Sequence, residues 1–206
     1  MQLRNTWTCI LLAAFLVACS TTPGDAAYRA GESEAAADLY KQGADQGDAL
    51  AALKLGLMIS ERQISGSKYG NKTMWYIRAC ELGTDAGCHN SGNSYEYGED
   101  GLTKDYNKAR EFYQKAAEMG FMQSQYNLGT LYSNQYFNDD TEGLKWLVLA
   151  EKKAADCATI PLCQWVVEDQ PGHRKKLMSR MSAEQIKKSN QLANGSITID
   201  YLASLR

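Results

Sequence analysis

The sequence predicts an all-helical fold built from repeated pairs of helices. Apolar positions recur at helical spacing in segments about 36 residues apart, and glycines close each segment. Runs of β-branched residues are rare, and only three prolines occur in 206 residues. With 44% apolar residues the chain can bury a core, and its length suits one domain.

Three stretches carry the repeat and align without gaps. They are "LYKQGADQGDALAALKLGLMI" from Leu39, "WYIRACELGTDAGCHNSGNSY" from Trp75 and "FYQKAAEMGFMQSQYNLGTLY" from Phe112. The second residue of each is a tyrosine, and the steps between them are 36 and 37 residues: Tyr40, Tyr76 and Tyr113. A weaker fourth copy begins at Trp146, where the signature of the second helix is lost.

Glycines and aspartates in the repeat indicate where helices begin, where they end and where two helices pack closely together. One set is predicted to end the first helix, because glycine tolerates the left-handed conformation after a helix: Gly47, Gly83 and Gly120. A second set lies inside the second helix and indicates close packing, because glycine costs about 1 kcal/mol there: Gly56, Gly92 and Gly129. Asp105 and Asp139 are predicted N-caps of first helices, and Lys68 takes that place in the second repeat.

A closing helix is predicted after the repeats. Ser182 and Gln185 have the spacing of a capping box, and Gly195 is expected to follow the end of this helix. For the tail, residues 196–206, a strand, a helix and a partner-dependent structure all remain open.

The stretch "YEYGEDGLTKDYNKAREFYQKAAEMGFMQSQYNLGTLY", residues 95–132, resembles the Sel-like repeats, which are related to tetratricopeptide repeats. The resemblance implies a right-handed solenoid of antiparallel helix pairs, with about four repeats over residues 28–170. Residues 171–206 are then a capping helix and tail, as solenoids require a polar terminal cap. Ser91 departs from the family pattern, which has leucine there.

The N-terminus has the layout of a secretory signal peptide. Arg4 precedes an uncharged run from Thr8 to Ala18, which is too short to span a bilayer. Its end, Leu-Val-Ala-Cys at residues 16–19, resembles a bacterial lipobox. The resemblance implies removal of residues 1–18, lipidation of Cys19, a flexible tether over residues 19–27 and, from Ser20, an outer-membrane protein facing the periplasm. An N-terminal core helix is the alternative.

Four cysteines would remain besides Cys19, and export to an oxidising compartment favours disulfides between them. Three pairings are possible, and we expect the two local ones, Cys80 with Cys88 and Cys157 with Cys163. The first spacing also occurs in cysteine-rich members of the Sel-like family. A zinc site that includes His89 is the rival interpretation, which we do not favour.

Enzyme signatures are missing from the sequence. It contains no H-E-x-x-H, no G-x-S-x-G and no phosphate-binding loop, so we expect no enzyme, no cofactor and no metal. The acidic cluster Glu96, Glu99 and Asp100 is interpreted as a solvated loop, and the basic run 173–180 as a solvated helix start or an attraction for anionic headgroups. A net charge of −2 excludes a typical nucleic-acid-binding protein.

Aromatic residues outside the repeat stripe are the candidates for a binding surface, since tyrosine and arginine are enriched at interfaces. The predicted protein-binding residues are Tyr69, Tyr97, Tyr106, Arg110, Tyr136 and Phe137. The expected function is that of a membrane-anchored periplasmic scaffold. Family resemblance suggests an immunity protein that neutralises a secreted effector, such as a type VI lipase. The alternatives are an adaptor in envelope or polysaccharide-export assembly, a β-lactam-binding or -hydrolysing protein, and a structural protein without a specific partner.

Overall fold

The computed structural model describes residues 22, 24–134, 136–156 and 161–203, and these contain helices and no strand. The predicted all-α solenoid of helix pairs is confirmed. Contacts divide the chain into two units, Met1–Gly87 and Cys88–Arg206. The predicted signal peptide, Cys19 and Cys157 lie outside the described residues.

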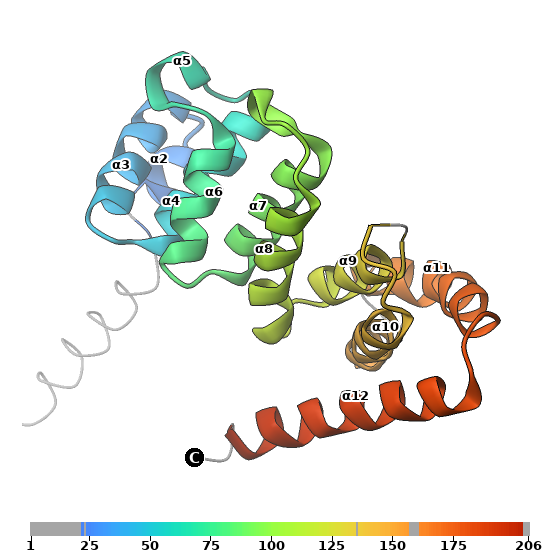
Figure 1. Ribbon diagram of the computed structural model, residues 1–206. Helices are drawn as coiled ribbons and strands as arrows, with labels where there is room; N and C mark the ends of the chain where they lie inside the picture. The colour runs from blue at the N-terminus through green and yellow to red at the C-terminus, as the bar shows by residue number, and fades with distance from the viewer. Residues whose placement is uncertain (1–21, 23, 135, 157–160, 204–206) are drawn as a thin grey trace, which may run out of the picture. The chain divides into compact units, whose positions relative to one another are not determined.

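The first unit contains the first helix pair, α3 (Ser33–Asp45) and α4 (Ala49–Ser60). A short helix, α2 (Asp25–Arg29), packs on α3, and α4 also packs against α6 (Lys72–Glu81), as Figure 1 shows. A further short helix, α5 (Gly66–Tyr69), lies between α4 and α6 in the chain. The core of this unit is formed by alanines, larger aliphatic residues and aromatic residues, among them Tyr40, Leu55 and Trp75.

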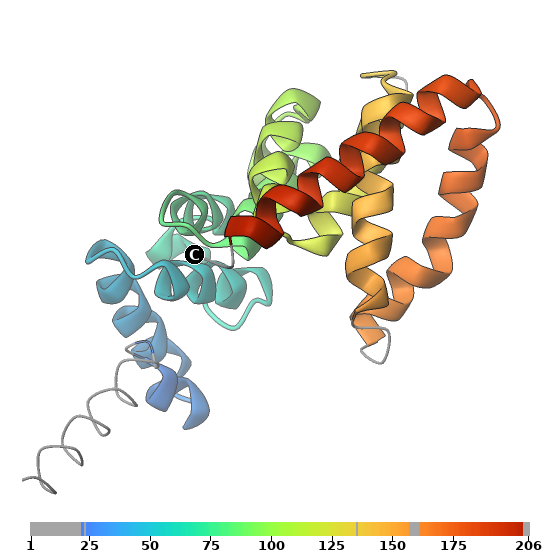
Figure 2. The same ribbon diagram turned by 90° about the horizontal axis from the view of Figure 1, so that it is seen from below.

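The second unit contains the larger part of α7 (Asp85–Tyr97), a short 3₁₀ turn (Glu99–Gly101), and the pair α8 (Tyr106–Glu118) and α9 (Met122–Ser133). The fourth pair is α10 (Asp140–Ala155) and α11 (Pro161–Met178), and α12 (Ala183–Ala203) follows. Helix α10 packs against α9, α11 and α12, and Figure 2 shows α12 as one long helix. This central position explains why α10 carries many buried apolar residues.

Both glycine predictions are confirmed. The glycines after the first helices have left-handed backbone, with φ of 93°, 98° and 87° at Gly47, Gly83 and Gly120. The glycines of the second helices make room for a side chain of the next helix. A Cβ atom at Gly92 would lie 2.5 Å from the Tyr113 ring, and one at Gly129 would lie 2.8 Å from Leu147. At Gly56 the neighbouring ring is that of Tyr76, at 2.7 Å.

The helix starts follow the predicted caps with one exception. Asp105 accepts a hydrogen bond from the Lys108 amide, and Asp139 accepts one from the Glu142 amide, which confirms both N-caps. In the second repeat the N-cap of α6 is Asn71, whose Oδ1 accepts from the Met74 amide at 2.8 Å. Lys68, which stands where the other repeats have a capping aspartate, does not cap a helix, because α5 occupies that stretch and α6 starts after it.

The closing helix begins as predicted and ends later. The Ser182 amide donates to Gln185 Oε1 and the Gln185 amide donates to Ser182 Oγ, which forms the capping box. Helix α12 continues through Gly195 to Ala203, so the expected end at Gly195 is wrong. Gly195 is not among the glycines with positive φ and therefore does not form a helix C-cap.

Two predicted segment boundaries also shift. Residue 171, the expected start of the capping segment, lies within α11, and α12 is the capping helix. At the N-terminus, α2 begins at Asp25, so residues 25–27 are helical and are not part of a flexible tether. Thr22 is already buried, and its hydroxyl donates to Asp25 Oδ1 at 2.8 Å.

Candidate protein-binding site

Four of the predicted binding residues lie together in the second unit. The rings of Tyr106 and Tyr136 are stacked, with centroids 3.9 Å apart and planes at 24°. The guanidinium carbon of Arg110 lies 4.6 Å from the centroid of the Phe137 ring. These four residues, which we call the aromatic surface, come from α8 and from the loop between α9 and α10.

Local sequence explains how the aromatic surface forms. Tyr106 and Arg110 are four residues apart on α8 and therefore share a face of the helix. On the loop, the Tyr136 amide donates to Asn134 Oδ1 at 2.9 Å. Asn138 adopts a left-handed conformation with φ of 50°, which asparagine tolerates better than most residues. This turn places two consecutive aromatic side chains, Tyr136 and Phe137, beside α8.

The aromatic surface has an anchored part and an open part. Phe137 packs against the core of the unit, with its centroid 5.8 Å from that of Tyr132. Tyr136 is 53% exposed, although it stacks on Tyr106. A hydrogen bond with Tyr136 raises the pKa of Tyr106, so the Tyr106 ring presents a neutral hydroxyl at neutral pH. Rigid aromatic side chains beside an arginine are typical of interface hot spots, because they lose little conformational entropy on binding.

Tyr97 is the most exposed of the predicted residues but does not join the aromatic surface. It is the last residue of α7 and is 60% exposed. The ring and cation contacts that define the aromatic surface do not include it. It therefore offers a comparison residue with the same side chain at a different place.

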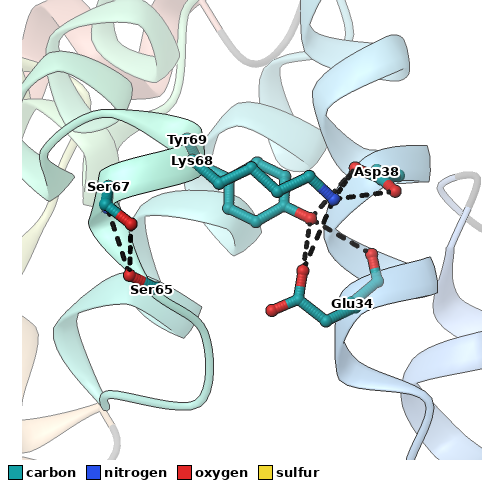
Figure 3. A network of polar contacts seen from close by, with 6 residues as sticks. All are labelled: Glu34, Asp38, Ser65, Ser67, Lys68 and Tyr69. Atoms are coloured by element: carbon teal, nitrogen blue, oxygen red, sulfur yellow. Dashed lines mark hydrogen bonds and ion pairs between the residues drawn. The ribbon is translucent and has the colours of Figure 1, made fainter.

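The prediction that Tyr69 lies on a binding surface needs correction. This residue is only 3% exposed and belongs to the core of the first unit. Its hydroxyl lies 2.8 Å from Glu34 Oε2 and 2.9 Å from Asp38 Oδ1, both on α3. Figure 3 shows these contacts as dashed lines. The ammonium group of Lys68 lies 2.9 Å from Asp38 Oδ1 and 4.7 Å from the centre of the Tyr69 ring. Burial raises the pKa of Tyr69. This residue therefore fixes α5 to α3 and does not bind a partner.

The amino end of α5 is held by its own cap, also visible in Figure 3. Ser65 Oγ accepts a hydrogen bond from the Ser67 amide, and the two hydroxyls are 2.8 Å apart. At the other end, Trp75 Nε1 donates to the Tyr69 carbonyl at 2.7 Å. The short helix thus joins α3 and α6 through polar contacts.

A second polar network, which sequence reasoning missed, surrounds Tyr113 in the second unit. The Tyr113 hydroxyl lies 2.6 Å from both Glu96 Oε2 and Asn93 Oδ1. Burial, reinforced by the Glu96 carboxylate, raises the pKa of Tyr113. The network extends to His89, whose Nδ1 is 2.8 Å from Ser124 Oγ. Glu96 is therefore a hydrogen-bond partner of a core tyrosine, not a member of a solvated acidic loop.

The pair of His89 and Ser124 does not have the properties of a catalytic nucleophile and base. Ser124 is completely buried, so a substrate cannot reach its hydroxyl. The ring of His89 is half-buried and packs 4.9 Å from that of Phe121, which restricts the imidazole. A buried, hydrogen-bonded serine of this kind satisfies polar groups between helices.

Cysteines in the described part of the chain are oxidised. Cys80, Cys88 and Cys163 are each disulfide-bonded. Cys157 lies outside the described residues, and the local pairings stay predictions. A disulfide-bonded sulfur cannot serve as a thiolate ligand, which argues against zinc at Cys80, Cys88 and His89. Across the described ranges, three or more histidine, cysteine, aspartate or glutamate side chains do not gather into a potential metal site.

Part of the basic run 173–180 is engaged within the second unit. Arg180 Nη2 is 2.5 Å from Asp140 Oδ1 and also donates to the Ser133 carbonyl. Arg174 forms an ion pair with Glu151 on α10. These arginines hold α11 and the start of α12 against α10. The charge that this run can offer to a membrane or to an acidic partner is therefore smaller than the sequence indicates.

Comparison with known proteins agrees with this architecture. A family model, the Sel1 repeat, matches residues 32–48, 74–84, 85–121 and 123–155. A sequence comparison with curated proteins gives no match. Within the described part of the chain, no helix combines the length and the apolar character needed to cross a membrane.

The solved structures that are similar to the chain include two repeat proteins. One is c5321, a protective antigen of uropathogenic Escherichia coli strains that displays an SLR fold, with 26% identity over 80% of this chain and a TM-score of 0.64. The other is a Sel1 repeat protein from Oxalobacter formigenes, with 29% identity over 57% of this chain and a TM-score of 0.47. The chain spans 33% of the first protein and 47% of the second. The four repeat matches, the helix pairs and the similarity to the first structure show that the chain contains Sel1 repeats, which form scaffolds for protein–protein interaction.

Proposed function

We propose that the chain is a lipid-anchored periplasmic scaffold that uses the aromatic surface to bind a protein, and that this partner is a secreted effector which the scaffold neutralises. The observation that carries the proposal is the arrangement of Tyr106, Tyr136, Arg110 and Phe137. Two pairs of side chains are pre-ordered by contacts with each other, while Tyr136 stays more than half exposed. Such pre-ordering lowers the entropy that binding costs.

Three further observations support the proposed class of protein, its compartment and its membrane anchor. The Sel1 repeats make the chain a protein-interaction scaffold, a class that generally has no enzymatic activity. The disulfide-bonded cysteines agree with an oxidising compartment. The lipobox-like sequence at residues 16–19 supplies the anchor, because two or more acyl chains hold a protein firmly at a membrane.

The partner can be identified by affinity purification from the host periplasm. Residues 20–206, tagged at the C-terminus and exported, should retain one near-stoichiometric protein that resembles a toxin or lipase. Recovery of several envelope-assembly proteins would instead establish the adaptor alternative.

The aromatic surface is tested with single variants against the purified partner. Tyr136→Ala should weaken binding about 30-fold, since hot-spot residues contribute roughly 2 kcal/mol. Tyr97→Ala is the matched control, because it removes an exposed tyrosine outside the aromatic surface and should leave the affinity within about two-fold of the wild type. Equal losses in the two variants, or no loss in Tyr136→Ala, would remove the aromatic surface from the proposal.

The anchor has its own test. Cys19→Ala should leave the precursor uncleaved and remove metabolic labelling with palmitate, because the thiol that accepts the lipid is gone. Labelling that persists in this variant would contradict lipidation at Cys19.

A further inference from the structure

A pocket of about 310 Å³ lies in the first unit between α2, α3 and α4, away from the residues used above. Its inner part is a fixed ion pair. Asp25 Oδ1 lies 2.6 Å from Lys54 Nζ, 2.7 Å from the Tyr40 hydroxyl and 2.8 Å from Thr22 Oγ1. The side chains of Lys54 and Asp25 are 34% and 20% exposed. The polar floor of the pocket is therefore pre-formed and still accessible.

The electrostatics of this floor keep it charged at neutral pH. Burial opposes ionisation of Asp25, but hydrogen bonds from Lys54, Tyr40 and Thr22 outweigh it and lower the pKa of Asp25 to about 2. Lys54 uses two of its three N–H donors, one on Asp25 and one on Thr22 Oγ1 at 2.6 Å. One ammonium donor of Lys54 thus remains for a ligand.

The rest of the lining carries both signs of charge and an apolar wall. Arg29 donates a hydrogen bond from Nε to the Asp25 carbonyl at 3.1 Å, and its two terminal amino groups carry four further N–H donors. Glu61 brings a carboxylate, of which Oε2 accepts from Gln63 Nε2 at 2.8 Å. Leu57 and the ring of Tyr28 are exposed apolar groups of the same pocket. A ligand that matches all three features has an anionic group, a cationic group and a short apolar body.

The pocket is also close to the proposed anchor. Thr22, buried and hydrogen-bonded to the pocket floor, is three residues after Cys19. Three extended residues reach at most about 11 Å, so lipidation of Cys19 would hold this end of the first unit near the headgroup layer. The identification of a lipid as the source of the ligand rests on the membrane anchor in the proposed function. The chemistry of the pocket does not depend on that anchor.

We propose that this pocket binds a phosphoethanolamine group, with the phosphate on Arg29 and Lys54, the primary ammonium on Glu61 and the glycerol carbons against Leu57. The guanidinium fork and the lysine ammonium together supply donors to the phosphate oxygens. The primary ammonium donates hydrogen bonds to a carboxylate, which the quaternary ammonium of choline cannot do. The group can come from a phospholipid headgroup or from a free phosphodiester.

The test uses residues 20–206, exported as for the affinity purification, which lack both Cys19 and the apolar run before it, so that its result is independent of lipidation and of the protein partner. Glycerophosphoethanolamine, the free source, is titrated while backbone amide signals are followed by NMR. Vesicles of phosphatidylcholine with phosphatidylethanolamine, the lipid source, are compared in co-sedimentation with pure phosphatidylcholine and with phosphatidylcholine containing phosphatidylglycerol.

We expect the free compound to shift the amide signals of residues 25–29 and 54–63, and the phosphatidylethanolamine vesicles to bind best. Arg29→Gln should weaken either interaction about ten-fold, the loss of one charge-assisted hydrogen bond. Glu61→Gln should abolish the preference for ethanolamine over choline. Lys41→Gln is the matched control: Lys41 forms an exposed ion pair with Asp45 at 2.7 Å on α3 and does not line the pocket.

Each outcome decides the proposal. Binding of the free compound without vesicle binding supports the pocket and assigns it to a soluble phosphodiester. Binding of both sources supports the lipid. The proposal is overturned if neither source binds, if Arg29→Gln and Lys41→Gln behave alike, or if phosphatidylglycerol binds as well as phosphatidylethanolamine.

Discussion

Replacement of Gly92 by alanine should destabilise the second unit, although alanine is the better helix former. A Cβ atom at this position would lie 2.5 Å from Tyr113 Cδ1 and Cε1 and 3.0 Å from Cγ. Carbon atoms pack at about 3.5–4.0 Å, so the ring has to move by about 1 Å. Tyr113 is completely buried, and its hydroxyl is held 2.6 Å from Glu96 Oε2, which opposes that movement.

The net effect follows from two terms of opposite sign. Overpacking of a core costs up to about 3 kcal/mol, and a ring held on two sides cannot relax freely. Alanine returns about 1 kcal/mol of helix propensity relative to glycine. We therefore expect Gly92→Ala to lower the free energy of unfolding by about 2 kcal/mol, measured by urea denaturation followed by circular dichroism.

Gly195→Ala is the matched control, because Gly195 is also inside a helix and a Cβ atom there would meet no heavy atom within 4 Å. This variant should gain about 0.5–1 kcal/mol through propensity alone. If Gly92→Ala were as stable as the wild type while Gly195→Ala gained stability, the close approach of Tyr113 would not constrain position 92, and the packing role assigned to the repeat glycines would be refuted.

Three other changes test the fold. The pKa of Asp25 is about 2 in the folded state and 3.8 ordinarily, so its contribution to the free energy of unfolding is present above pH 4 and is lost as the pH falls toward 2. Asp25→Asn should therefore reduce the loss of stability in acid by about 1–2 kcal/mol, measured by urea unfolding at several pH values. An unchanged dependence of stability on pH would contradict this prediction. Ser182→Ala should cost about 1 kcal/mol by opening the capping box, with a melting temperature that stays constant as the opposing result. Reduction of the disulfides should cost roughly 2–3 kcal/mol for each of the two predicted local bridges, and identical unfolding curves with and without reductant would show that they contribute nothing.

Local chemistry explains what the sequence predicted correctly about helix boundaries. A left-handed backbone after a helix requires glycine or a similar residue, and an N-cap requires a side-chain oxygen, so Gly83, Gly120, Asp105 and Asp139 could be assigned from their neighbours alone. The same kind of reasoning was wrong at Gly195, because a glycine is also tolerated inside a helix. At Lys68, where the aspartate of the other repeats is missing, the sequence did not indicate that the inserted helix α5 moves the cap to Asn71.

Which aromatic residues reach the surface was not predictable from the sequence. Tyr69 and Tyr136 both lie in connections between repeat helices, yet one is 3% and the other 53% exposed. The position of each side chain depends on contacts with residues more than 25 positions away in the chain. Tyr69 contacts Glu34 and Asp38, and Tyr136 contacts Tyr106. A repeat pattern does not specify such contacts, because it records which positions face a neighbouring helix and not which loop side chains meet.

The sequence by itself determined the helix pairs, their caps and the close approach at the repeat glycines, since these depend on backbone conformation and on residue size at fixed spacing. The tertiary structure alone decided that four of the predicted binding residues meet in one aromatic surface, that Arg174 and Arg180 are neutralised on α10, and that side chains from α2, α3 and α4 line one pocket. The physical reason is that hydrogen bonds, ion pairs and ring contacts between distant segments require three-dimensional positions, which local propensities do not contain.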